Sequence, residues 1–192
     1  MILRLLELEF KTMEIKYIIE EQDHLTFQLH RASTLPSIKR KRLREWLMTP
    51  LSFLCLAFLF SYSEKTGLMY YFLVLGVVAI IGMPFYTKWR YKRHYLKHVR
   101  ELYKNNFGKM CTIKFMDEHI EMVGEDGESK FKLSQITEVN EIADYYFLQL
   151  ASGPTIIISK QKTTEREALA NKIQKIVSQF KIKHIVNLNW KW

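Results

Sequence analysis

Two short groups of residues have the types and the spacing that could support chemistry. His94 and His98 stand four positions apart, which would place both imidazoles on one face of a helix at metal-ligand spacing. The stretch "MDEHIE" (116–121) sets a histidine among three carboxylates, a combination that could form an acid–base site. The basic neighbours of the two histidines would repel a dication and favour headgroup contact or solvation, and "MDEHIE" suits a turn between strands. We therefore predict no catalytic residue, no metal site and no cofactor.

A third candidate is "SKQK" (159–162), where Lys160 and Lys162 precede a predicted helix. The positive end of a helix and two ammonium groups could contact an anion. A solvated strand end is the alternative. The sequence has no glycine-rich phosphate loop, nucleophile elbow or H-E-x-x-H motif. An enzyme with an unrecognised site therefore stays only as an alternative.

Two uncharged runs, residues 46–62 and 68–87, dominate the middle of the chain. At a helical rise of 1.5 Å per residue they reach about 26 and about 30 Å, close to the thickness of the hydrocarbon core of a bilayer. We predict two transmembrane helices joined by an external loop at 63–67. A buried helical hairpin in a soluble protein is the disfavoured alternative, because neither run has a polar face.

Basic residues are concentrated at the outer ends of these runs. Of a net charge of +9, residues 38–44 supply five basic groups and residues 88–100 supply six, with no acid in either stretch. Because Lys and Arg near span ends stay inside the cell, we expect a cell-membrane protein with both termini cytoplasmic. The residues assigned to the membrane interface are Lys39, Arg40, Lys41, Arg42, Arg44, Trp46, Lys88, Trp89, Arg90, Lys92 and Arg93. They predict contact with the anionic cytoplasmic leaflet, and their two-block arrangement argues against nucleic acid.

The segment before the membrane, residues 1–37, is predicted to form a strand and a short helix. "EIKYII" (14–19) is rich in β-branched and aromatic residues, and "EEQDHLTFQLHRAS" (20–33) has helical spacing. A strand this short cannot form a sheet alone, so we expect both elements to dock on the C-terminal domain. "MILRLLELEF" is broken by charges and is not expected to be a cleaved signal, and Met13 is an alternative start.

The two basic stretches are expected to flank the spans as a foot at 38–45 and a juxtamembrane helix at 88–108. From Lys109 the hydrophobic period changes to two, which predicts short antiparallel strands. These are residues 110–116, 119–123, 129–133, 136–142, 145–150 and 155–159. Residues 163–180 are predicted to form an amphipathic helix with a capping box from Thr164 to Glu167, and 181–192 a tail.

This layout resembles the YcxB-like family of bacterial membrane proteins, from about Met13 to Phe180. The resemblance rests on the opening "EEQDHLTFQLHRAS", the basic foot, two spans, a second basic stretch and a small β-rich domain. It implies an α+β membrane protein with a two-helix transmembrane hairpin. It further implies that residues 109–180 form a pleckstrin-homology-like antiparallel sheet or partial barrel closed by a C-terminal helix. The family supplies no activity to carry over.

Small residues recur on the second span at Gly76, Ala79 and Gly82, a pattern that lets another helix approach closely. That helix is either the first span or a second copy of the chain. For function we expect a membrane-anchored cytoplasmic binding or scaffold module whose ligand is an anionic lipid or an unidentified protein. A structural or regulatory subunit of a larger membrane complex is the alternative.

Overall fold

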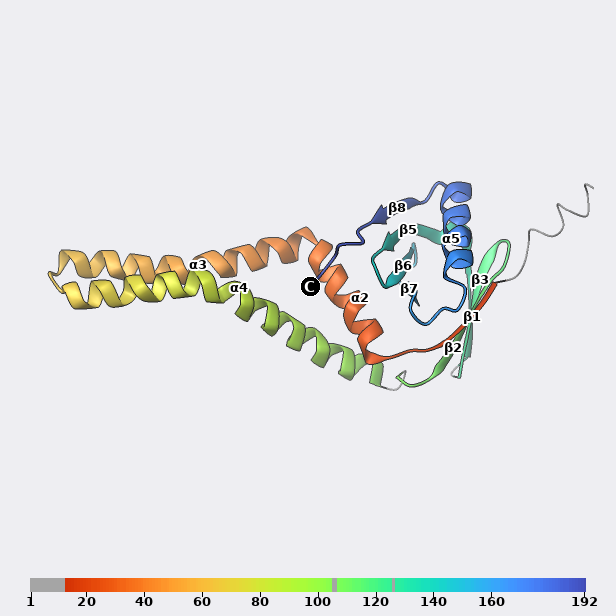
Figure 1. The fold of residues 1–192 in the computed structure, drawn as a ribbon, viewed down its shortest axis with the longest axis horizontal. Helices are drawn as coiled ribbons and strands as arrows, with labels where there is room; N and C mark the ends of the chain where they lie inside the picture. Colours follow the sequence, from red (N-terminus) through yellow and green to blue (C-terminus); the bar gives the residue numbers. More distant parts are fainter. Residues whose placement is uncertain (1–12, 105–106, 126) are drawn as a thin grey trace, which may run out of the picture. The chain divides into compact units, whose positions relative to one another are not determined.

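The computed structural model describes residues 13–104, 107–125 and 127–192, so the predicted segment before Met13 lies outside the described residues. The chain divides into two units. One combines the described residues up to Phe27 with Tyr103–Lys191, and the other comprises Gln28–Leu102 and Trp192. The fold is α+β, with a hairpin of two long apolar helices, two four-stranded sheets and a C-terminal helix (Figure 1).

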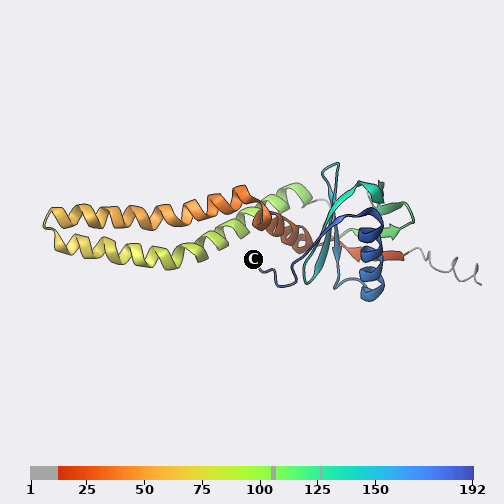
Figure 2. The ribbon, with the colours of Figure 1, turned by 90° about the horizontal axis from the view of Figure 1, so that it is seen from above.

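The hairpin consists of α3 (Pro36–Tyr62) and α4 (Thr66–Tyr103), which lie side by side in Figures 1 and 2. Pro36 occupies the first turn of α3, where its missing N–H costs no helical hydrogen bond. The preceding helix, α2 (Glu21–Thr34), therefore ends just before it. Each basic stretch is continuous with the neighbouring apolar run, so the foot at 38–45 and the stretch at 88–103 are helical.

The two helices pack through a few close contacts. The Trp46 indole N–H donates to the Ile80 carbonyl at 3.1 Å, and the rings of Phe60 and Phe72 stack at 5.4 Å. Within α3 and α4, which the structure describes in full, the buried residues are Pro50, Ala57, Gly76, Thr87 and Val99. Most large apolar side chains of both helices are exposed. By length and composition, both helices could cross a membrane.

The first sheet joins the N-terminal strand to strands that follow the hairpin. Its order is β1 (Met13–Ile18), β2 (Met110–Phe115), β3 (His119–Gly124) and β4 (Gly127–Lys132), all antiparallel. Met13 is the register partner of Phe115, and Ile18 is the partner of Met110. The hairpin is therefore inserted, in sequence, between two neighbouring strands.

The second sheet has the order β7 (Thr155–Ser159), β6 (Tyr145–Leu150), β5 (Ile136–Glu141) and β8 (Lys183–Val186). The segment at 181–192, predicted as a tail, contains β8, which pairs in parallel with β5. A four-residue strand after a helix carries too short a hydrophobic pattern to be recognised. Such a short strand is recognised only by its pairing with β5, which lies far earlier in the sequence.

The C-terminal helix α5 (Arg166–Phe180) starts later than predicted. The capping box is absent, since Glu165 is the N-cap residue and makes no side-chain capping bond. The neighbouring Thr163 hydroxyl instead donates to the Ser159 carbonyl at 2.8 Å. That bond holds the connection between β7 and α5.

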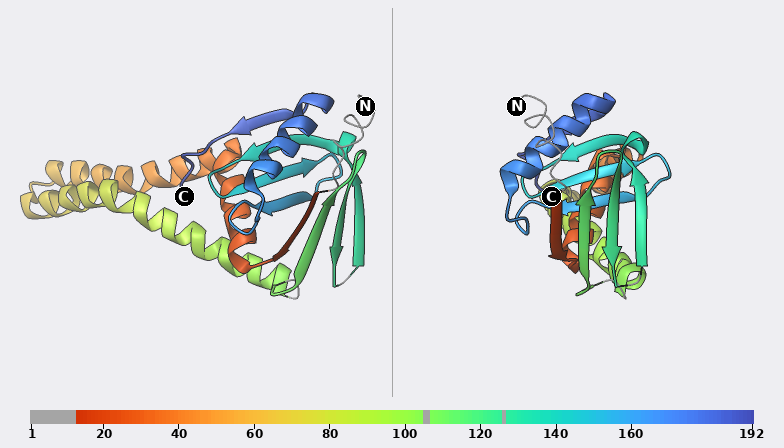
Figure 3. Two further views of the ribbon diagram at one scale, coloured as in Figure 1. Left: turned by 45° about the vertical axis from the view of Figure 1, so that its right-hand side comes forward. Right: turned by 90° about the vertical axis from the view of Figure 1, so that its right-hand side faces the viewer.

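The unit that contains both sheets, here called the β unit, has its core where α5 meets the two sheets (Figure 3). Alternate side chains of β1 and β2 are buried, as the two-residue period predicts, whereas β6 is buried at nearly every position. The side chains that are almost completely buried include Ile113, Phe115, Ile120, Val139, Leu148, Ile158, Leu169 and Ile173. The sheets do not close into a barrel, since each keeps two edge strands.

Replacing Ile15, which is 3% exposed on β1, tests whether the N-terminal strand belongs to this core. Ile15→Ala should lower the free energy of unfolding by about 2–4 kcal/mol, because it leaves a cavity. Lys16→Ala, on the exposed face of the same strand, should change it by less than about 0.5 kcal/mol. Denaturant unfolding in detergent measures both. Equal, small effects would contradict a structural role for β1.

Candidate functional site

Among the described residues, no set of three or more His, Cys, Asp or Glu side chains could hold a metal ion. In "MDEHIE", Asp117 and Glu118 lie in the connection from β2 to β3. On β3, Glu121 accepts from Lys130 at 2.6 Å and lies 3.0 Å from His119. Hydrogen bonds from Lys130 and then His119 hold the pKa of Glu121 below its usual value, so it is a surface ion-pair partner.

The anion contact at Lys160 and Lys162 stays a prediction, and in the structure a carboxylate lies beside each ammonium group. Lys160 lies 2.7 Å from Glu141, and Lys162 lies 2.8 Å from Asp23. Burial opposes ionisation of Glu141, but the hydrogen bond and charge of Lys160 keep its pKa below the usual value. The partners come from distant strands and from α2, so the sequence around "SKQK" does not show them.

A buried polar network surrounds Asp23, which is 1% exposed in the first turn of α2. Its carboxylate accepts from the Glu20 backbone N–H, from Lys162 and from the Tyr145 hydroxyl, each at 2.8 Å. Burial, and then the hydrogen bond to Asp23, raises the pKa of Tyr145, so the hydroxyl stays a donor. The network ties the start of α2 to β6 and to the segment after β7. In the sequence, the only sign of this network is an acidic residue shortly after a predicted strand. Its partners could not be predicted, because Tyr145 and Lys162 lie 122 and 139 positions away.

His24 lies beside this network. Its ring stacks on Tyr103 with 4.2 Å between centroids, and Phe107 lies 6.1 Å away. Burial lowers the pKa of His24, and the charge of Asp23 opposes this only in part. The imidazole is therefore held neutral by an apolar, aromatic environment.

The residues assigned to the membrane interface lie on α3 and α4, on either side of a small cavity. All of the basic residues in this set are exposed except Arg42, which is partly buried: Lys39, Arg40, Lys41, Arg44, Lys88, Arg90, Lys92 and Arg93. Trp89 is also exposed, and the Arg93 guanidinium lies 5.4 Å from its ring centroid. Trp46 is partly buried in the hairpin through its bond to Ile80.

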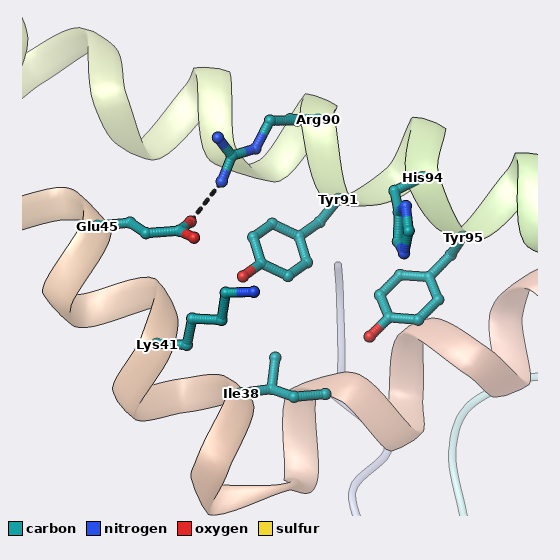
Figure 4. Close-up of a pocket in the computed structure, with 7 residues that line it drawn as sticks. All are labelled: Ile38, Lys41, Glu45, Arg90, Tyr91, His94 and Tyr95. Carbon is teal, nitrogen blue, oxygen red and sulfur yellow. Dashed lines mark hydrogen bonds and ion pairs between the residues drawn. The ribbon is translucent and has the colours of Figure 1, made fainter.

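The hairpin-base pocket is a cavity of about 320 Å³ between α3 and α4. It is lined by Ile38, Lys41, Glu45, Arg90, Tyr91, His94 and Tyr95. Figure 4 shows the rings of Tyr91 and Tyr95 extending from α4, with Lys41 of α3 directed toward Tyr91 and Glu45 of α3 facing Arg90. Arg90 and Glu45 form an ion pair across the cavity. The pocket thus combines cationic and aromatic groups from both helices.

The Tyr91 hydroxyl is enclosed and has no hydrogen-bond partner among the described residues. The guanidinium groups of Arg42 and Arg90 each lie 5.8 Å from the Tyr91 ring centroid. Arg42 also lies 4.8 Å from the ring of Trp192, whose indole N–H donates to the Lys88 carbonyl at 3.3 Å. From the sequence, Arg42 and Arg90 were assigned to the membrane interface. Tyr91, Tyr95 and Trp192 were not identified. The four-residue spacing of the two tyrosines was the available signal.

The small residues of the second span do not share one face. A Cβ added at Gly76 would lie 3.2 Å from Leu54 Cδ2 on α3, so this glycine allows close helix packing. Gly82 is exposed, and no atom would lie within 4 Å of a Cβ there. Ala79 is partly buried. Three residues turn an α-helix by about 300°, which is less than a full turn, so each small residue is rotated away from the one before it.

Removing the carboxylate at the centre of the buried network should be costly. Asp23→Ala leaves Lys162 without its buried partner and Tyr145 without an acceptor, so the free energy of unfolding should fall by about 3 kcal/mol. Asp117→Ala, at an exposed turn, should change it by less than about 0.5 kcal/mol. Denaturant unfolding compares the two. A loss from Asp23→Ala no larger than the control would show that the network adds no stability.

Because burial lowers the pKa of folded His24, the unfolded chain takes up this proton first as the pH falls below 6.5. Stability from His24 is therefore present above that pH and is lost as the pH falls toward the depressed folded value. His24→Phe keeps an aromatic ring without the titration. The melting temperature of the native chain minus that of His24→Phe should decrease as the pH is lowered from about 8 to about 5. A pH-independent difference would contradict this.

Comparison with known proteins supports part of the family resemblance. A family model described as YcxB-like protein matches residues 115–170, from the end of β2 into α5. No match was found among curated proteins or among solved structures. The matched stretch contains β3 to β7 and lies after the hairpin in the sequence. The chain therefore carries a YcxB-like domain at residues 115–170.

Proposed function

We propose that this chain is a membrane-anchored binding module whose helices α3 and α4 cross the cell membrane. The observation that carries the proposal is the outward-facing apolar surface of the hairpin, where Leu47, Leu51, Phe58, Val78 and Ile81 are among the exposed side chains. Soluble monomers rarely expose apolar patches of more than a few hundred Å². A bilayer is the solvent that suits two such helices.

The sheet connectivity supports a hairpin that returns to the side from which it starts. β1 precedes the hairpin and β2 follows it, and the two strands pair along their full length. Both outer ends of the hairpin must then be on the same side of the membrane. The basic residues at those ends, against one acid and one base in the tip at 63–65, favour the cytoplasm for this side and for both termini.

The binding element of this proposal is the β unit at 109–180, arranged as a pleckstrin-homology-like partial barrel. Two facing sheets, antiparallel except where β8 pairs with β5, and the amphipathic helix α5 support that arrangement. Its ligand class is a protein or an anionic lipid. We propose no catalysis, because the polar clusters at Asp23, Glu121 and Glu141 are paired with lysines.

A second candidate function is a structural or regulatory subunit of a larger membrane complex. The observation that favours it is the open surface at Gly82, which leaves room for the helix of another chain or a second copy. Crosslinking through Gly82→Cys in membranes would distinguish this candidate, since a lone module gives only monomers.

Cysteine labelling tests the anchoring and the orientation together. Lys65→Cys lies in the hairpin tip and Ser152→Cys in the exposed turn between β6 and β7. A membrane-impermeant maleimide added to intact cells should label position 65 and leave position 152 unlabelled until the cells are permeabilised. The native chain, with Cys55 and Cys111, measures the background. Labelling of position 152 in intact cells would show the opposite orientation, and recovery in the soluble fraction would overturn the anchor.

A further inference from the structure

We propose that the hairpin-base pocket binds the phosphate group of an anionic membrane lipid. This inference rests on the proposed membrane anchoring, because the bilayer would place the pocket among lipid headgroups. It goes further by naming one site and one chemical group, where the interface residues predict only a general attraction to the leaflet.

The position of the pocket along the helices matches the headgroup layer. Glu45 directly precedes the uncharged run at 46–62, and Arg90 follows the run at 68–87 by three residues. Lys41 and His94 lie four residues farther out, which is about 6 Å at a rise of 1.5 Å per residue. The polar layer on each side of the hydrocarbon core is about 5–8 Å thick. A headgroup phosphate can therefore reach the pocket while its acyl chains stay in the bilayer.

The charge in the pocket suits one phosphate. Lys41 has no ion-pair partner among the described residues, and its side chain extends toward the ring of Tyr91 (Figure 4). Arg90 is paired with Glu45, yet a guanidinium has five N–H donors and can hold a carboxylate and a phosphate together. Arg42 adds a third cation 5.8 Å from the Tyr91 ring. The lining itself holds two cations, Lys41 and Arg90, against the carboxylate of Glu45, so it is net positive, and Arg42 lies beside it.

The enclosed Tyr91 hydroxyl supplies an independent reason for a ligand with acceptor oxygens. A buried polar group without a partner is costly, and nearly all such groups in folded proteins are satisfied. A phosphate oxygen between Lys41 and Tyr91 would accept from both. A cavity of about 320 Å³ has room for a headgroup.

The exposed basic residues outside the pocket provide matched controls. Lys39 stands two positions from Lys41 on the same helix, and Lys92 stands two positions from Arg90. Neither lines the pocket. Each control removes one charge at nearly the same membrane depth, so general electrostatic attraction predicts the same loss for control and pocket variants.

The test is native mass spectrometry of the full chain in detergent, titrated with phosphatidylglycerol or with phosphatidylcholine. We expect selective retention of phosphatidylglycerol. Lys41→Gln should weaken it by about tenfold, the usual scale for one charge-assisted hydrogen bond, and Tyr91→Phe by about threefold. Lys41→Arg should retain binding, and Lys39→Gln and Lys92→Gln should change it by less than about twofold. Melting temperatures close to that of the native chain identify the variants that fold.

Equal losses from Lys41→Gln and Lys39→Gln would overturn the pocket in favour of diffuse attraction. Competition by inorganic phosphate or glycerol 3-phosphate at the concentration of the lipid would assign the site to a free phosphate and overturn the lipid. A chain that passes the cysteine-labelling test but retains both lipids equally overturns this inference alone. Failure of the labelling test overturns the anchoring itself, so the two proposals fail separately.

Discussion

The pairing of β1 with β2 is the constraint on which the rest of this structure depends. These strands are neighbours in the first sheet, yet residues 19–109 separate them in the sequence. Backbone bonds continue the ladder beyond the strands, with Ile19 N–H donating to the Lys109 carbonyl at 3.2 Å and Gly108 N–H to the Ile19 carbonyl at 3.0 Å. The chain must therefore leave the sheet and return to the same end of it. A hairpin of two long helices is an insertion that meets this requirement.

The network at Asp23 secures the point where the chain leaves the sheet. A buried carboxylate is stable only when its charge and its acceptor capacity are used, and Lys162, Tyr145 and the Glu20 N–H use them. The same contacts occupy Lys162, while Glu141 occupies Lys160. The two lysines that precede α5 thus form ion pairs that link distant parts of the β unit.

The hairpin base has a different electrostatic character. Lys41, Arg42 and Arg90 surround Tyr91 there, with Glu45 as the one carboxylate lining the pocket. Topology alone requires an excess of positive charge at the cytoplasmic ends of two spans. It does not require a cavity, an enclosed phenol or tyrosines four residues apart. It is on these features that we base the proposal that the hairpin base recognises one chemical group.

The sequence by itself determined the local elements. The uncharged runs and their basic flanks specified both long helices, and the two-residue period located β2 to β7 within a few residues, because these patterns are carried by near neighbours. The YcxB-like resemblance was confirmed at residues 115–170. Only the tertiary structure decided what depends on distant partners: that β8 pairs with β5, that Lys160 and Lys162 are neutralised, and that Gly82 is exposed while Gly76 packs. The pocket at Tyr91 belongs to the same class, since it forms only when residues about fifty positions apart meet across the hairpin.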